Sequence, residues 1–151
     1  MVTGNRKAFL DMIAWIEGTQ RIKNSDNGYN VIVGGSLFTS YADHPRKSIK
    51  LPKLGIKSTA AGRYQLLARY FDVYKEMLKL PDFGPDSQDA IAIQQLKECH
   101  ALADIDAGRF EMAVHKCARI WASLPGAGYG QHEHKLSDLE LAYLNAGGDI
   151  A

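Results

Sequence analysis

The sequence has few of the features that would place it in a specialised class of protein. Among 151 residues it has two cysteines, Cys99 and Cys117, and they do not form a CxxC pair. Neither a disulfide framework nor a zinc motif is therefore indicated, and we expect both residues to be small buried side chains in helices. A run of about 18 apolar residues, which a transmembrane helix needs, is also lacking.

An excess of charge of one sign is lacking too. The 18 Lys and Arg residues nearly balance 17 Asp and Glu residues and leave a formal net charge of +1. No global field therefore favours a nucleic acid or a membrane surface. The glycine motifs of nucleotide-binding proteins and the GxSxG motif of serine hydrolases are absent, and we expect no cofactor. His132, Glu133 and His134 are adjacent and lack the HExxH spacing, so we expect no metal site.

The N-terminal stretch lacks the signature of a targeting segment. Asp11 and Glu17 interrupt the apolar residues that follow its basic pair, so neither a signal peptide nor a membrane anchor is indicated. We therefore expect the protein to accumulate in the cytoplasm. If it acts beyond the membrane, another component must release it.

What the sequence does contain is the hydrophobic spacing of a mostly helical chain with a small sheet. Residues 5–17 have a helical pattern that a glycine ends. Residues 29–41 hold two β-prone runs around Gly34 and Gly35 and are predicted to form a hairpin. Residues 42–62, with two prolines and two glycines, are expected to be irregular. Length and element order predict one α+β domain over residues 1–151.

The rest of the chain is predicted to be helices separated by short breaks. Apolar residues at helical spacing start at Tyr64. The pattern is interrupted between Pro81 and Pro85 and then continues. Asp86 or Ser87 can cap the next helix. Ser137 and Glu140 have the spacing of a capping box, which predicts that the last helix begins there.

Glu17 is the first candidate for chemistry. It lies at the expected end of a helix, beside the apolar face and directly before Gly18. Partial burial and the negative end of the helix dipole would both raise the pKa of its carboxyl group. A carboxyl group that keeps its proton near neutral pH can act as a general acid. A surface glutamate at a frayed helix end is the simpler alternative.

Two loops rich in small residues are candidates for ligand contact. Residues 58–65 (STAAGRYQ) run into the helix expected at Tyr64 and would leave backbone groups open to a ligand. Residues 126–131 (GAGYGQ) combine three glycines with two polar side chains. The ring of Tyr129 can stack on a sugar, and the amide of Gln131 can bond hydroxyl groups. Each loop is also compatible with a purely structural role.

A third candidate is a stretch of one-sided charge. Between His44 and Phe71 the sequence has basic residues and no acidic one: Arg46, Lys47, Lys50, Lys53, Lys57, Arg63 and Arg69. Such a bias favours an anionic polymer. Few aromatic residues are interleaved before Tyr64, which argues against single-stranded nucleic acid. A solvated basic loop is the simpler alternative.

Four long blocks of the sequence resemble a known family: RKAFLDMIAWIEGT (6–19), GYNVIVGGSLFTSYADHPRK (28–47), KSTAAGRYQLL (57–67) and IWASLPGAGYGQHEHK (120–135). Together they resemble the lambda-type phage endolysins, which are lytic transglycosylases. The resemblance covers almost the whole length. It implies a lysozyme-like fold, mostly helical, in which a small antiparallel sheet from residues 29–41 forms a second lobe beside a glycan-binding cleft.

The resemblance also implies an activity. Such enzymes cut the MurNAc–GlcNAc β-1,4 bond of peptidoglycan without adding water, leave a 1,6-anhydroMurNAc end, and lyse the host cell. The glutamate of the WxEGT block, here Glu17, is implied to be catalytic. The residues implied or expected to bind substrate are Ser58, Gly62, Tyr64, Gln65, Tyr129 and Gln131.

Two alternative functions are also compatible with the sequence. A hydrolytic muramidase would need a second carboxylate, for which Asp26 and Asp43 are candidates. A non-catalytic module that binds peptidoglycan or nucleic acid is the alternative from another class. The expected partner is the peptidoglycan glycan strand, with no nucleic acid, no membrane insertion and a monomeric state. By resemblance, a holin would release the enzyme from the host cytoplasm to the periplasm and cell wall.

Overall fold

The computed structural model describes residues 4–121, 124 and 134–151. The contacts divide the chain into two compact units, and each is described by itself. Unit 1 comprises Met1–Ile16 and Ala92–Ala151, and unit 2 comprises Glu17–Ile91. That both belong to a single domain remains a prediction.

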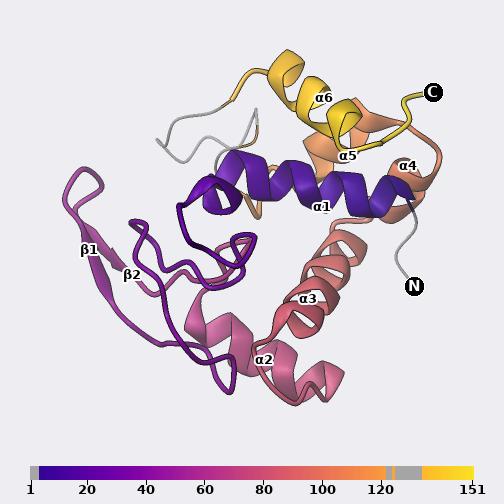
Figure 1. The fold of residues 1–151 in the computed structure, drawn as a ribbon. Helices are drawn as coiled ribbons and strands as arrows, with labels where there is room; N and C mark the ends of the chain where they lie inside the picture. The colour runs from indigo at the N-terminus through magenta and orange to yellow at the C-terminus, as the bar shows by residue number, and fades with distance from the viewer. Residues whose placement is uncertain (1–3, 122–123, 125–133) are drawn as a thin grey trace. The chain divides into compact units, whose positions relative to one another are not determined.

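Unit 1 is helical. It contains α1 (Gly4–Glu17) up to Ile16 and the second half of α3 (Pro85–Glu98), as Figure 1 shows. It also contains the shorter helices α4 (Leu102–Asp106), α5 (Phe110–Cys117) and α6 (Leu136–Asn145).

Aromatic side chains form the centre of unit 1. Phe9 of α1, Phe110 of α5 and Tyr143 of α6 are at most 3% exposed. The ring centroid of Phe9 lies 6.1 Å from that of Phe110 and 6.4 Å from that of Tyr143, and both contacts are edge-to-face. The buried residues of α1 include the consecutive Ala8, Phe9 and Leu10, so more than one face of the helix is covered.

The two cysteines lie in unit 1, as buried residues. Cys117 is the last residue of α5, and Cys99 follows directly after α3. A hydrogen bond from the Cys117 thiol is the main cause that lowers the pKa of Cys99, to about 6. Both thiols are free. The expectation that both are buried is confirmed, although Cys99 lies one residue beyond its helix.

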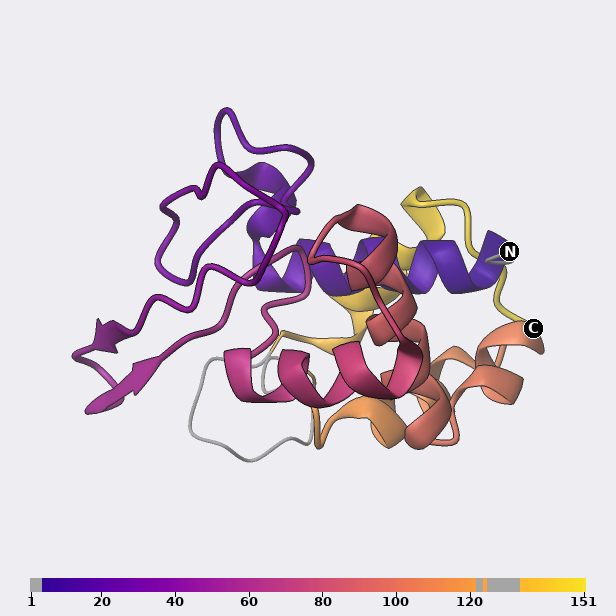
Figure 2. The ribbon, with the colours of Figure 1, turned by 90° about the horizontal axis from the view of Figure 1, so that it is seen from below.

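Unit 2 contains the short 3₁₀ helix η1 (Thr19–Arg21), strands β1 (Ile49–Leu51) and β2 (Ile56–Ser58), helix α2 (Ala68–Leu78) and the start of α3. Its apolar cluster consists of Ala61, Phe71, Phe83 and Ile91. The buried ring of His44 lies 4.8 Å from the ring of Phe83 between centroids. Figure 2 shows the two strands at one end of the unit.

The predicted position of the sheet was wrong. Residues 29–41 contain only the isolated bridge Val31–Leu37 within that range, and the two-stranded antiparallel sheet comes from residues 49–58, which were expected to be irregular. Gly34 and Gly35 do make a turn, with φ angles of 92° and 104°. The flanking residues do not extend the ladder because Ile32 pairs with Ala61 instead.

Several helix boundaries also differ from the prediction. Tyr64 and Gln65 lie in a turn closed by the Ala61–Leu66 bridge, and α2 begins at Ala68. Helix α3 begins with Pro85, a residue whose fixed φ suits the first helical position. Helix α6 begins at Leu136 without a side-chain cap, so the capping box does not form. No helix among the described residues is long and apolar enough to cross a membrane.

Candidate functional site

Glu17 is the last residue of α1, as predicted. The side chain is partly buried, and burial raises the pKa of the carboxyl group to about 7. The chain leaves the helix at Gly18, whose φ of 75° lies in the left-handed region. A proton is therefore available on this carboxyl group near neutral pH, as a general acid requires.

The segment after Glu17 is fixed by a buried hydrogen bond. The Thr19 hydroxyl donates to the carbonyl oxygen of Arg63 at 2.6 Å, and Thr19 is only 2% exposed. Gly28 lies against it, because a Cβ there would lie 2.8 Å from the Thr19 Oγ1. This close approach ties the loop at Gly28 to the residue two positions after Glu17.

Arg63 joins its own loop to the segment that contains Gln20 and Asn27. Its guanidinium donates to the Asn27 carbonyl oxygen at 3.0 Å, to Gln20 Oε1 at 3.2 Å and to Tyr64 Oη at 3.1 Å. The residue is 3% exposed. Its planar group is also near the faces of two tyrosine rings, those of Tyr29 and Tyr64. Arg63 is therefore a structural cation of the site loops and not part of a solvated basic surface.

Asp89, on α3, accepts hydrogen bonds from two tyrosines. Tyr64 Oη donates at 2.6 Å and Tyr29 Oη at 3.0 Å. Burial and the nearby carboxylate raise the pKa of both phenols, that of Tyr29 to about 12. Sequence reasoning did not find Asp89, because a single aspartate inside a helix belongs to no motif. Its only signal would have been a polar residue beside the apolar positions of α3.

The predicted substrate contacts of unit 2 are placed in local hydrogen bonds. Gln65 Nε2 donates to the Gly62 carbonyl oxygen at 2.9 Å, and Ser58 Oγ accepts from the Ala60 N–H at 3.1 Å. Gly62 has a φ of 86°, and a Cβ there would clash with the Gln88 amide oxygen. Tyr64 is 6% exposed with its hydroxyl bonded on both sides, a geometry that favours support of the loop over contact with a ligand.

Two other predictions concern the residues before α6. Tyr129 and Gln131 lie outside the described residues, as do His132 and Glu133 of the rejected metal motif. Within the described part of the chain, no group of three or more His, Cys, Asp and Glu residues has the arrangement of a metal site.

Both candidates for a second carboxylate have other partners. Asp43 accepts hydrogen bonds from the Arg46 guanidinium at 2.9 and 3.2 Å, which hold the pKa of Asp43 below its usual range. Asp26 accepts from Tyr41 Oη at 2.6 Å. Both carboxylates are therefore hydrogen-bonded to other side chains of unit 2.

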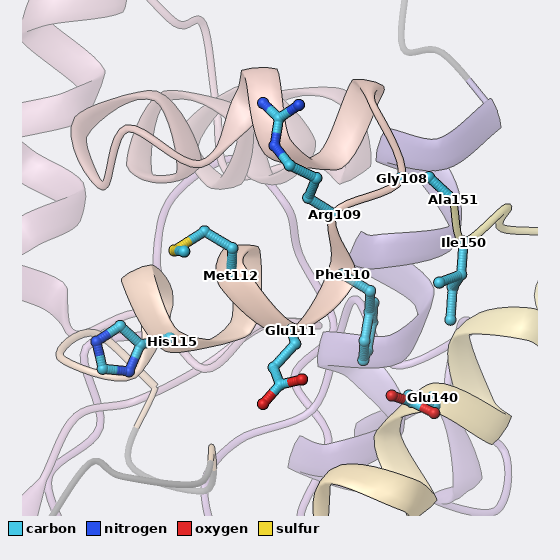
Figure 3. Close-up of a pocket in the computed structure, with 9 residues that line it drawn as sticks. All are labelled: Gly108, Arg109, Phe110, Glu111, Met112, His115, Glu140, Ile150 and Ala151. Atoms are coloured by element: carbon cyan, nitrogen blue, oxygen red, sulfur yellow. The ribbon is translucent and has the colours of Figure 1, made fainter.

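The pocket drawn in Figure 3 lies apart from these residues in the sequence, wholly in unit 1. Its lining mixes opposite charges and apolar groups: Gly108, Arg109, Phe110, Glu111, Met112, His115, Glu140, Ile150 and Ala151. No predicted site residue lines it.

Comparison with known proteins gives full-length matches. A profile of the Endolysin family matches residues 7–150. The endolysin of Escherichia phage lambda is 57% identical over 152 residues, which cover 99% of this chain and 95% of that protein. The endolysin of Escherichia phage P2 is 50% identical over 154 residues, covering 95% of this chain and 93% of that protein.

Solved structures of bacteriophage lambda lysozyme are also similar to this chain. Bacteriophage lambda lysozyme complexed with a chitohexasaccharide is 55% identical and superposes with a TM-score of 0.96, covering 100% of this chain and 99% of that one. A second structure of lysozyme from bacteriophage lambda has a TM-score of 0.91, the same identity and the same coverage. The expected lysozyme-like fold is thus confirmed, and the chain belongs to the endolysin family.

Proposed function

We propose that this endolysin is a lytic transglycosylase, which cuts the MurNAc–GlcNAc β-1,4 bonds of peptidoglycan with Glu17 as the only acid and base. The observation that carries the proposal is the partly buried carboxyl group at the end of α1, with a pKa of about 7. Such a group is protonated often enough to act as an acid and ionised often enough to act as a base at neutral pH.

In the first step, Glu17 gives its proton to the glycosidic oxygen as the bond to C1 of MurNAc breaks. The acetamido group of the same sugar stabilises the positive charge that develops at C1. In the second step, Glu17 takes the proton of the C6 hydroxyl while O6 bonds to C1. The ring closes as 1,6-anhydroMurNAc, Glu17 is protonated again, and no water is consumed.

The single carboxylate favours this route over hydrolysis. Glycosidases that use water or an enzyme nucleophile place two carboxylates at the bond. Here Asp26 and Asp43 are held by Tyr41 and Arg46. The C6 hydroxyl needs no second carboxylate, because it is already tethered to the reacting sugar and proximity replaces activation.

Glycan binding is part of the proposal. A chitohexasaccharide is bound in the lambda lysozyme structure, which supports an oligosaccharide-binding cleft in this chain as well. We propose that Ser58, Gly62, Gln65, Tyr129 and Gln131 contribute to it, while Tyr64 supports the loop from its buried position. Neither a cofactor nor a metal ion enters this mechanism.

Mass spectrometry of muropeptides released from purified peptidoglycan tests the mechanism. Products with 1,6-anhydroMurNAc ends, each one water lighter than the muramidase fragment and without new reducing ends, are expected. Reducing MurNAc ends would mean that water is the nucleophile, and the muramidase alternative would replace this one. Protein that binds the wall and releases nothing would leave only a binding module.

Release from the cell is a further part of the proposal. We propose that the monomeric enzyme stays in the host cytoplasm until a holin opens the membrane, and then reaches the periplasm and cell wall. Expression without a holin should give no lysis until the membrane is permeabilised. Spontaneous lysis of intact expressing cells would contradict this requirement.

A further inference from the structure

The β1–β2 hairpin carries a group of lysines that have no role in the mechanism proposed for Glu17. Lys50 in β1 pairs with Lys57 in β2, and Lys53 lies in the turn between the strands. All three side chains are exposed, and no ion pair is recorded for them in the described ranges. Figure 1 shows the strands reaching out from the rest of unit 2.

The register brings two of these charges together. Lys50 and Lys57 are directly opposite in the antiparallel ladder, so their side chains leave the same face with Cβ atoms roughly 4.5–5.5 Å apart. Like charges placed in this way destabilise a ladder. Two adjacent carboxylates bound at this face would relieve the repulsion.

The opposite face of the hairpin helps to identify the partner. Successive residues of a strand point to opposite faces, so Leu51 and its partner Ile56 lie on the other face from the lysine pair. Ile56 is 52% exposed. The lysine pair and this aliphatic side chain therefore do not share one face, as they would on a strand lying flat on a bilayer, whereas a branched anionic polymer needs only the lysine face.

We propose that Lys50, Lys53 and Lys57 bind the carboxylates of the peptide stems of peptidoglycan, and so recognise stem-bearing wall over bare glycan. This inference rests on the proposed function for its choice of polymer. Each stem presents several carboxylates on a flexible peptide, which matches a cluster of exposed ammonium groups. The hairpin lysines then form a specificity-determining surface next to Ser58, the proposed sugar contact at the end of β2.

The test measures binding to insoluble sacculi by depletion of protein from solution. Every protein carries Glu17→Gln so that the sacculi stay intact. The test variant adds Lys50→Gln, Lys53→Gln and Lys57→Gln. The control variant adds Lys7→Gln, Lys79→Gln and Lys97→Gln, three exposed lysines outside the hairpin, and so changes the net charge equally. Each protein is compared on native sacculi and on sacculi whose carboxylates have been converted to methylamides with carbodiimide.

We expect the hairpin variant to bind native sacculi roughly 10-fold more weakly than its parent, since three exposed charge pairs are lost. Both proteins should bind the methylamidated sacculi alike. The control variant should keep most of its affinity, and the difference should vanish near about 1 M salt, where exposed pairs are screened.

Three results would overturn the inference: equal loss in the control variant, equal loss on methylamidated sacculi, or no loss at all. Tighter, lysine-dependent binding to phosphatidylglycerol vesicles than to sacculi would assign the hairpin to a lipid surface instead. Failure of the proposed function is separately visible, because sacculi that clear in the Glu17→Gln background would refute the role of Glu17 while the binding comparison stays measurable over short times.

Discussion

Each of the two units of this endolysin is stabilised internally by a different kind of interaction. In unit 1, rings from three helices meet in a buried cluster around Phe9. In unit 2, segments are joined through buried polar groups, because Arg63 donates to Gln20, Asn27 and Tyr64 while Asp89 accepts from two phenols. Unit 1 also has a buried polar centre, because Arg109 and Lys116 bind the carboxylate of Asp104.

The difference follows from what each unit must hold in place. Helices satisfy their own backbone groups and need only an apolar face to pack, whereas loops must find partners for each buried donor and acceptor. Hydrogen bonds are directional, so the polar network fixes the path of the chain after Glu17 more closely than apolar packing could.

The largest effect is expected at Glu17, where the sequence passes from one unit to the other. Glu17→Gln removes the only proposed acid and base, so lysis activity should fall by about 10²- to 10⁴-fold. The turbidity of a cell-wall suspension measures it, and circular dichroism should show an unchanged helix content. A variant with half of the parent activity would refute the assignment.

In unit 1, truncation of one ring should be costly. Phe9→Ala leaves a cavity between α1, α5 and α6 and should lower the free energy of unfolding by about 3–5 kcal/mol. Urea denaturation measures it, with Phe9→Leu as the control because most of the volume is kept. A loss below about 1 kcal/mol would mean that the ring cluster does not organise this unit.

In unit 2, pairwise coupling between polar groups should add to the packing of the Phe71 and Phe83 cluster as a source of stability. Tyr64→Phe should lower the free energy of unfolding by about 1–3 kcal/mol, because it removes a donor to a charged carboxylate. In a double-mutant cycle, Tyr64→Phe and Asp89→Ala together should cost clearly less than the sum of their separate effects. Strict additivity would show that the network seen here is not energetically connected.

The hydrogen-bond network around Arg63 and Asp89 was the part of the molecule that could be predicted least from the sequence. Helix α1 was predictable because its apolar spacing and the following glycine agree, and that placed Glu17 correctly. The sheet was misplaced because short strands such as Ile49–Leu51 alternate an apolar residue with lysine and carry little β signal. Asp89 was missed because its partners are 25 and 60 residues away, and long-range polar contacts leave no local pattern.

The burial of Glu17 should also appear as a pH dependence of stability. The pKa of its carboxyl group is about 7 in the folded protein, against 4.5 for a glutamate free of its surroundings, so the folded state binds more protons between these values. Stability should therefore fall as the pH rises through this window. Glu17→Gln removes the free-energy cost of ionising this buried carboxyl group. It should therefore raise the melting temperature at pH 8 relative to the parent, but not at pH 4. Equal shifts at both values would contradict the burial effect.

The smallest effect is expected at an exposed ion pair of unit 1. Arg6 donates to Asp106 at 2.9 and 2.7 Å, with side chains 25% and 40% exposed. Because water screens such a pair, Arg6→Gln should cost less than about 1 kcal/mol, and the difference should shrink with added salt. The same urea experiment measures it. A salt-independent loss of unfolding free energy as large as that of Tyr64→Phe would contradict the difference between the units. A polar contact in the helical unit would then stabilise the protein as much as one in the loop network.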